Sequence, residues 1–225
     1  MGLVYQNSCG FSTDDNGDDL VYRLAMDEQL TLFGEPQYDI IIGADEAGRG
    51  PLAGPVCAAA VVLPQDFPFE LLNDSKKLSE KRRIEAEPVI KQRAVAWAVA
   101  WATPAEIDRI NILQASMLAM KRAYLLVHKQ LKEKGIRADV LLVDGNKRPD
   151  VDIACHAIVK GDAKIHEIMA ASILAKNARD RFMVCAAKRW PGYGFEKHKG
   201  YPCASHKAAL HKLGPCPIHR LTFKY

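Results

Sequence analysis

The feature that most constrains the fold is the alternation of short apolar runs with longer amphipathic segments. Five runs of mostly small and β-branched residues have the length of buried strands, over residues 39–45, 54–63, 93–102, 138–144 and 152–162. Helical segments lie between or after them, over about residues 79–91, 111–134, 164–188 and 205–213. Ser79 and Asn111 are suited to cap the first two helices, and Gly135 to end the second. This order predicts an α/β fold with a mixed five-stranded sheet flanked by helices.

Length and composition fit an ordinary folded domain. The chain has 225 residues, enough to bury a large core. Its longest apolar stretch, Val56 to Leu63, is far shorter than the roughly 20 residues that cross a bilayer, so no membrane contact is expected. The N-terminus lacks the basic and apolar regions of a secretory signal. Six cysteines without a C-x-x-C pair are typical of reduced thiols, so we expect a cytoplasmic protein.

Charge is distributed unevenly along the chain. Residues 1 to 40 contain eight acids and one arginine, whereas residues 160 to 225 contain 13 Lys or Arg and four acids. Residues 1–38 are acidic and poor in apolar side chains, which predicts a flexible leader before a folded domain over residues 39–225. The C-terminal part of that domain, from about residue 189, should be helical. Its basic character favours binding to a polyanion such as a nucleic acid, although a solvated helix surface would have the same charge.

Four acids lie where an apolar run gives way to a glycine-containing turn. They are Asp45 and Glu46 in GADEAG, Asp144 in LLVDGN and Asp162 in VKGDAK. A single acid at a strand end is most often a turn-forming or helix-capping residue. Functional groups of α/β proteins gather at strand ends, so four acids in such positions indicate a cluster. Clustered carboxylates repel one another, and binding of Mg²⁺ or Mn²⁺ would relieve that repulsion. The residues alone therefore predict a metal-dependent phosphoryl-transfer site.

Six motifs resemble, in their order along the chain, those of bacterial type 2 ribonuclease H, also called ribonuclease HII. They are GADEAGRGPLAGPV, LNDSKKLSEKRR, LLVDGN, VKGD, AASILAKNARD and YGFEKHKGYP, within about residues 40 to 225. The resemblance implies a ribonuclease H-like fold and a monomeric endonuclease that hydrolyses the RNA strand of RNA–DNA hybrids. It also implies cleavage on the 5′ side of a single ribonucleotide in duplex DNA, leaving a 3′-hydroxyl and a 5′-phosphate. Ribonucleotide removal and RNA primer removal would be its roles.

The resemblance further implies roles for individual residues. The family's four catalytic acids, which hold two Mg²⁺ or Mn²⁺ ions, match Asp45, Glu46, Asp144 and Asp162. Gly48, Arg49 and Gly50 match the segment whose backbone contacts the 2′-hydroxyl of the ribonucleotide, and glycine permits a close approach to the sugar. Tyr201 matches the tyrosine that stacks on the next sugar, although by itself it would be an ordinary loop aromatic.

Two more groups of residues match parts of the family that bind or support the substrate. One is a backbone-binding loop with Asn73, Ser75 and Lys76, whose ammonium group can neutralise a phosphate. The other lies on one face of the predicted helix over residues 164–188 and comprises Ser172, Lys176 and Arg179. The helical group could support the acids or contact DNA, and ion pairs on a helix surface are a comparable interpretation.

Several alternatives stay open at this point. Arg49 favours a type 2 enzyme over type 3 ribonuclease H, which tends to have lysine there. The other candidates are a DNA-acting nuclease of the same fold, such as an integrase or junction resolvase, a binding module without chemistry, and a small-molecule phosphatase. The intact acids disfavour the binding module, and the basic C-terminal third disfavours the phosphatase. Two C-x-x-H pairs could bind structural zinc, although the family has these histidines without it: Cys203, His206, Cys216 and His219.

A short motif in the leader, QLTLF, resembles the peptide by which many bacterial replication and repair proteins dock on the sliding clamp. In such peptides a glutamine and spaced apolar side chains enter a groove on the clamp. The corresponding residues here are Gln29, Leu30, Leu32 and Phe33. The alternative is an amphipathic segment that packs on the folded domain.

Overall fold

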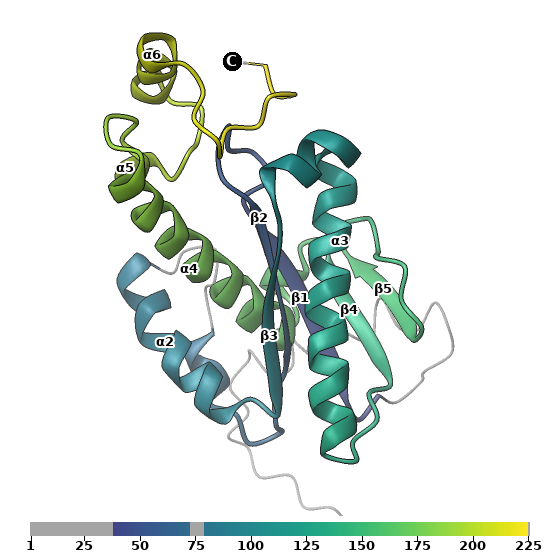
Figure 1. The fold of residues 1–225 in the computed structure, drawn as a ribbon. Coiled ribbons are helices and arrows are strands. Elements are labelled where there is room, and N and C mark those ends of the chain that lie inside the picture. Colours follow the sequence, from purple (N-terminus) through teal and green to yellow (C-terminus); the bar gives the residue numbers. More distant parts are fainter. Residues whose placement is uncertain (1–37, 73–78, 225) are drawn as a thin grey trace, which may run out of the picture. The chain divides into compact units, whose positions relative to one another are not determined.

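A five-stranded mixed sheet forms the centre of the folded domain (Figure 1). The computed structural model describes residues 38–72 and 79–224. The strands are β1 (Ile41–Ala47), β2 (Val56–Val62), β3 (Ala96–Ala102), β4 (Val140–Asp144) and β5 (Ala154–Ile158). Their order across the sheet is β3-β2-β1-β4-β5, with β2 antiparallel to β1 and β3, and with β1, β4 and β5 parallel. The predicted sheet is confirmed.

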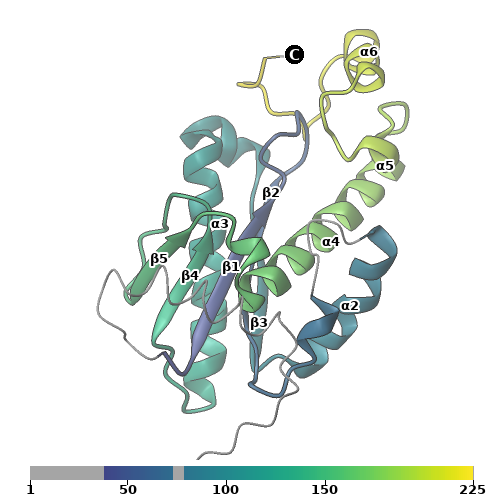
Figure 2. The same cartoon turned by 180° about the vertical axis from the view of Figure 1, so that it is seen from behind.

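Helices cover both faces of this sheet. They are α2 (Glu80–Arg93), α3 (Pro104–Glu133), α4 (His166–Arg189), α5 (Phe195–His198) and α6 (Ala204–Leu213), with 3-10 turns η2 (Phe69–Leu71) and η3 (Gly161–Ala163). Helix α3 packs on one face, whereas α2 and α4 pack on the other (Figure 2). Helices α5 and α6 follow the C-terminal end of α4 and form the predicted helical region. Within the described ranges, no helix is long and apolar enough to cross a membrane.

Strand β3 shows how the sequence separates the two faces of the sheet. Its AWAVAWA pattern alternates with a period of two, so the alanines point to α3 and the larger side chains to the other side. Trp97 and Trp101 pack in the core between the sheet and helices α2 and α4. The α3 side also contains buried alanines from the helix, namely Ala115, Ala119 and Ala123. Small residues on both partners allow α3 to lie close to the strands.

Capping residues define two helix starts. Ser79 caps α2 as predicted, and its hydroxyl accepts a hydrogen bond from the backbone N–H of Arg82 at 3.3 Å. The predicted start of the next helix at Asn111 is wrong, because α3 begins at Pro104 after a capping box formed by Thr103 and Glu106. Asn111 instead marks a kink, with φ of 68°, and its side chain accepts from the backbone N–H of Gln114 at 3.1 Å. Asn111 therefore caps the second segment of α3, after the kink, and does not start the helix.

Helix α4 contacts β1 very closely at Gly43. A Cβ at this glycine would lie 2.3 Å from the backbone carbonyl carbon of Glu167. The contact buries Glu167, in the first turn of α4, and leaves its Oε2 atom without a hydrogen-bond partner among the described residues. Burial raises the pKa of Glu167 to about 7. The close packing thus positions α4 over β1, but it buries the Glu167 carboxyl group, whose charged form is disfavoured there.

Glu167 makes a testable contribution to the pH dependence of stability. Its native pKa lies above the unfolded value of 4.5, so the native state holds the proton longer, and stability falls as the pH rises from 4.5 through about 7. We compare the unfolding free energy of Glu167→Gln with that of the wild type at each pH. We expect this difference to shift by about 3 kcal/mol in favour of the variant when the pH rises from 4 to 8.5. Urea unfolding at several pH values measures this gain, and Glu85→Gln, at an exposed position of α2, is the matched control. A Glu167→Gln difference that is the same at both pH values would contradict the prediction.

Candidate active site

Three of the four predicted acids lie at adjoining strand ends. Asp45 and Glu46 belong to the C-terminal half of β1, and Asp144 is the last residue of β4. The two strands are parallel neighbours, with Ala44 opposite Val143. Parallel neighbours end at the same edge of a sheet, so the carboxylates of both strands meet there.

The fourth acid, Asp162, reaches the same edge from the turn after β5. Its backbone N–H donates to Oδ1 of Asp144 at 3.3 Å. Lys160 has a left-handed backbone with φ of 59°, which turns the chain back towards β4. At Gly161 a Cβ would lie 2.7 Å from the Ile168 side chain, so this turn fits closely under the start of α4. The structure therefore places Asp162 beside Asp144, as the position of both acids after strands predicted.

Asp45 and Glu46 lie in an environment that disfavours their negative charge. Asp45 is only 6% exposed, and its pKa is raised well above the usual range, first by burial and then by the charges of Glu46 and Asp144. A hydrogen bond from Ser172 and one from the N–H of Glu46, at 2.6 Å, oppose this rise. Burial also raises the pKa of Glu46, against the effect of the Arg49 guanidinium 3.2 Å away. A bound cation would relieve these costs.

The donor set fits a hard divalent cation that takes ligands from outside the protein. Within residues 38–72 and 79–224, no group of three or more His, Cys, Asp or Glu side chains is arranged so that the protein alone could hold a metal ion. Mg²⁺ commonly keeps several waters and binds through one or two carboxylates together with substrate phosphates. Carboxylate oxygens at this edge of the sheet suit such an ion and equally Mn²⁺.

The loop between β1 and β2, residues 48–55, contains the GRG motif and is called the GRG loop here. Gly48 has φ of 99°, and a Cβ there would lie 1.9 Å from Nε of Arg179. Arg49 and Gly50 are exposed, and a Cβ at Gly50 would make an ordinary contact of 3.6 Å with the Tyr201 ring. Gly48 is thus required by the fold, whereas Gly50 leaves open space next to Tyr201.

Tyr201 lies on a second loop that is joined to the GRG loop. The backbone N–H of Leu52 donates to the carbonyl of Gly200 at 2.8 Å, and the Arg179 guanidinium lies 6.0 Å from the centre of the Tyr201 ring. The Tyr201 side chain is 43% exposed, which is unusual for a large aromatic residue in a connected loop. The two segments predicted to contact the ribonucleotide and the following sugar therefore lie side by side.

The three predicted residues on α4 have different surroundings. The Ser172 side chain bonds to Asp45, and Lys176 forms an ion pair of 2.7 Å with Asp180. The helix-surface interpretation is wrong for Arg179, which is only 1% exposed and points beneath the GRG loop. Nothing in the helical spacing of these residues indicated that Arg179 would be buried.

Two groups of predicted residues lie outside the described part of the chain. The first is the loop group, Asn73, Ser75 and Lys76. The second is the leader, residues 1–38 apart from Tyr38, with its motif Gln29, Leu30, Leu32 and Phe33. Their roles stay predictions.

Three side chains of the C-x-x-H pairs, those of Cys203, His206 and His219, have hydrogen-bond partners within the protein. Nε2 of His206 lies 3.2 Å from Nε2 of His219, and Nδ1 of His219 accepts from the backbone N–H of Cys216 at 2.9 Å. Sγ of Cys203 lies 3.1 Å from the Ser205 hydroxyl. Burial lowers the pKa of His219 to about 4, so this histidine is neutral at pH 7. The two imidazoles connect α6 to the C-terminal segment.

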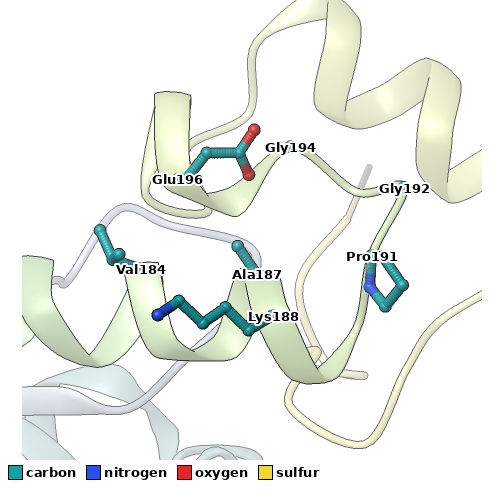
Figure 3. A pocket seen from close by; sticks show the side chains of 7 residues that line it. All are labelled: Val184, Ala187, Lys188, Pro191, Gly192, Gly194 and Glu196. Carbon is teal, nitrogen blue, oxygen red and sulfur yellow. The ribbon is translucent and has the colours of Figure 1, made fainter.

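The acids do not line the surface hollow formed by α4 and α5. That hollow has a volume of about 570 Å³, and side chains of Val184, Ala187 and Lys188 face Glu196 across it (Figure 3). None of the predicted site residues belongs to its walls. The candidate active site is formed by an edge of the sheet with two loops beside it.

Comparisons with known proteins identify the proteins that this chain resembles. The family model described as Ribonuclease HII matches residues 42–225. Ribonuclease HII of Dechloromonas aromatica (strain RCB) is 55% identical over 184 residues, covering 82% of this chain and 90% of the relative.

Solved structures show the same fold. Ribonuclease HII in the PCNA:RNase HII complex from Archaeoglobus fulgidus is 26% identical, with a TM-score of 0.65 over 83% of this chain and 96% of that chain. A more distant type 3 enzyme, Bst-RNase HIII in complex with Mn²⁺, has a TM-score of 0.54 at 17% identity, over 91% of this chain and 76% of that chain. The similarity to the type 3 enzyme concerns the fold alone.

Proposed function

Since this chain belongs to the ribonuclease HII family, and is thus a ribonuclease H that acts on RNA–DNA hybrids, we propose a more specific reaction for it. It cuts on the 5′ side of a single ribonucleotide in duplex DNA and leaves a 3′-hydroxyl and a 5′-phosphate. This activity would remove misincorporated ribonucleotides and RNA primers in the cytoplasm, and the chain would act as a monomer. The observation that supports the proposal is the position of the GRG loop and Tyr201 directly beside the acidic strand ends.

Four carboxylates are proposed to hold the metal ions on which this family depends: Asp45, Glu46, Asp144 and Asp162. Two ions, Mg²⁺ or Mn²⁺, would activate a water nucleophile and stabilise the leaving oxygen of the phosphodiester. Two of these acids have partners that favour their charged form, since Ser172 hydrogen-bonds to Asp45 and the Arg49 guanidinium pairs with Glu46. Burial and mutual repulsion, which raise the pKa values of Asp45 and Glu46, would be relieved by a bound cation that displaces the proton.

Selectivity is assigned to the backbone and ring beside these acids. Exposed backbone at Arg49 and Gly50 would contact the 2′-hydroxyl, the group that distinguishes RNA from DNA at one nucleotide. Tyr201 would stack on the next sugar. Lys176 and the loop with Asn73, Ser75 and Lys76 are proposed to bind the phosphate backbone, for which Lys176 would exchange its Asp180 partner.

A comparison of three substrates tests the proposed function. The substrates are a duplex with one ribonucleotide, a uniform RNA–DNA hybrid and an all-DNA duplex, each with Mg²⁺, Mn²⁺ or a chelator. We expect cleavage of the first two only, and only with a divalent ion. Cleavage of the hybrid alone would indicate type 3 specificity. Equal cutting of the all-DNA duplex would indicate a DNA nuclease. Binding without any cutting would indicate a binding module without catalytic activity.

We further propose that the leader binds the bacterial sliding clamp. The support is the QLTLF motif together with the archaeal relative, which is solved in a complex with PCNA. Replacing Leu32 and Phe33 with alanine should abolish capture by the immobilised clamp and leave cleavage unchanged. The matched control replaces Val21 and Tyr22 of the same leader. Capture that survives the loss of Leu32 and Phe33 would overturn this proposal.

A further inference from the structure

Two arginine side chains are buried beneath the GRG loop. Arg179 of α4 is 1% exposed, and Arg220, close to the C-terminus, is fully buried. All three nitrogens of each guanidinium donate to backbone carbonyls rather than to a carboxylate. Arg220 donates to Gly54 at 2.9 Å, Arg49 at 2.8 Å and Gly48 at 2.5 Å. Arg179 donates to Pro55 at 3.2 Å, Lys199 at 3.1 Å and Ala53 at 3.1 Å.

The bonds from Arg220 determine which way two peptide groups face. The described chain has no cis peptide bond, and in a trans peptide the carbonyl and the N–H point in opposite directions. Because the carbonyls of Gly48 and Arg49 point inward to Arg220, the N–H groups of Arg49 and Gly50 point away from it. Arg49 and Gly50 are both exposed, so these two donors face the side from which a substrate would approach.

Only a guanidinium can make this set of contacts. Its planar fork presents donors to separate carbonyls at once, whereas a lysine ammonium is a single point on a flexible chain. Burying a charge is costly unless it is hydrogen-bonded, and each of the three guanidinium nitrogens of Arg220 donates one hydrogen bond. Burial, and to a smaller extent Arg179, lowers the pKa of Arg220 to about 9, which still leaves it protonated at pH 7.

Asp108, which lies outside the candidate active site, holds the chain segment that follows Arg220 by hydrogen bonds. The Asp108 carboxylate, in α3, accepts from the backbone N–H groups of Leu221 and Thr222, both at 3.0 Å, and from the Thr222 hydroxyl at 2.7 Å. Asp108 is only partly buried and does not touch the GRG loop in any of these bonds. We therefore expect a change at Asp108 to loosen the segment that positions Arg220, while the guanidinium itself and its partners in the GRG loop are chemically unchanged.

We propose that Arg220 is a positioning residue for ribonucleotide selection: it holds the GRG loop so that the N–H groups of Arg49 and Gly50 are aimed at the sugar hydroxyl. The inference rests on the proposed function, since it assigns a cause to the selectivity of that site. Arg179 has the corresponding role at the junction of the GRG loop with the Tyr201 loop, because it bonds to carbonyls of both.

The test compares Arg220→Lys and Asp108→Ala with the wild type. For each, kcat/KM is measured on a duplex with one ribonucleotide, and binding is measured on an all-DNA duplex with Ca²⁺ in place of Mg²⁺, both per folded molecule. We expect Arg220→Lys to lose at least tenfold in kcat/KM and Asp108→Ala to lose a few fold, while DNA binding changes less than twofold. The matched control is Arg122→Lys, where a guanidinium also bonds to a backbone carbonyl, that of Trp101, but away from the site. It should change neither quantity more than twofold.

Three results would overturn the inference. One is kcat/KM of Arg220→Lys within twofold of the wild type. Another is an equal loss of ribonucleotide cleavage and DNA binding, which indicates general damage. The third applies if Arg220→Lys does not fold. In that case Asp108→Ala is the test, and a kcat/KM of this variant equal to that of the wild type contradicts the proposal. A wild type that fails to cut the ribonucleotide duplex refutes the proposed function itself and the inference with it.

Discussion

Asp45→Asn is expected to abolish cleavage while leaving the fold at least as stable as the wild type. The amide keeps the shape of the side chain but removes the charge that would bind the metal ion. Metal-assisted stabilisation amounts to several kcal/mol, and each 1.4 kcal/mol is tenfold in rate, so the loss should be about 10³-fold or more. In a metal-free buffer at pH 8 the variant should melt no lower than the wild type, because burial and two neighbouring acids disfavour the Asp45 carboxylate.

Calorimetry with and without Mg²⁺ provides the complementary measurement for this variant. The wild type should gain thermal stability from Mg²⁺, since a ligand that binds only the native state stabilises it. Asp45→Asn should gain much less. The matched control is Asp139→Asn, whose carboxylate accepts backbone hydrogen bonds near the start of β1, away from the acidic edge. Full cleavage by Asp45→Asn, or an undiminished Mg²⁺ effect, would contradict the metal site.

The second large effect is expected at Gly48. A side chain there would adopt φ of 99° and overlap the buried Arg179, with a Cβ only 1.9 Å from Nε. Strain of this backbone type alone costs about 1–3 kcal/mol, and the overlap adds to it. We therefore expect Gly48→Ala to lose more than about 2 kcal/mol of unfolding free energy, by urea unfolding, together with nearly all cleavage. Gly135→Ala is the control for strain without overlap, since Gly135 has φ of 70° and no atom within 4 Å of its Cβ position.

Gly50→Ala, two residues further along, separates folding from selectivity. Its Cβ would make only an ordinary 3.6 Å contact with Tyr201, so unfolding free energy should stay within about 0.5 kcal/mol of the wild type. The added methyl group would nevertheless occupy the side from which the sugar approaches. We expect at least a tenfold lower kcat/KM on the single-ribonucleotide duplex. An unstable Gly50→Ala, or a stable and active Gly48→Ala, would reverse the roles assigned to the two glycines.

The sequence predicted that the acids would lie near one another, because their positions depend on a simple rule of topology. Each of the strands β1, β4 and β5 is recognisable as an apolar run, and parallel neighbours end at one edge. Acids placed after such runs must therefore approach one another. The same argument located Asp144 and Asp162 without any knowledge of the turn between them, whose left-handed Lys160 no local pattern indicated.

The sequence was less informative about the loops that surround these acids. It explained both glycines of the GRG motif by close approach to a sugar, whereas Gly48 is needed for its backbone angle and for the space taken by Arg179. It gave no sign that Arg220 is buried, because the partners of this guanidinium are backbone carbonyls, which any residue provides. Burial of a charge by distant chain segments is a property of the tertiary structure.

The most direct test of the central claim is to map where, and with what chemistry, the wild type cuts a duplex containing one ribonucleotide. A 2′-hydroxyl can attack only its own 3′ phosphate, so a cut on the 5′ side requires water as the nucleophile. Mass spectrometry of the products with Mg²⁺ should show a single cut on the 5′ side, with a 3′-hydroxyl on one fragment and a 5′-phosphate on the other. A cut on the 3′ side that leaves a cyclic 2′,3′-phosphate, or equal cutting of an all-DNA duplex, would contradict the account.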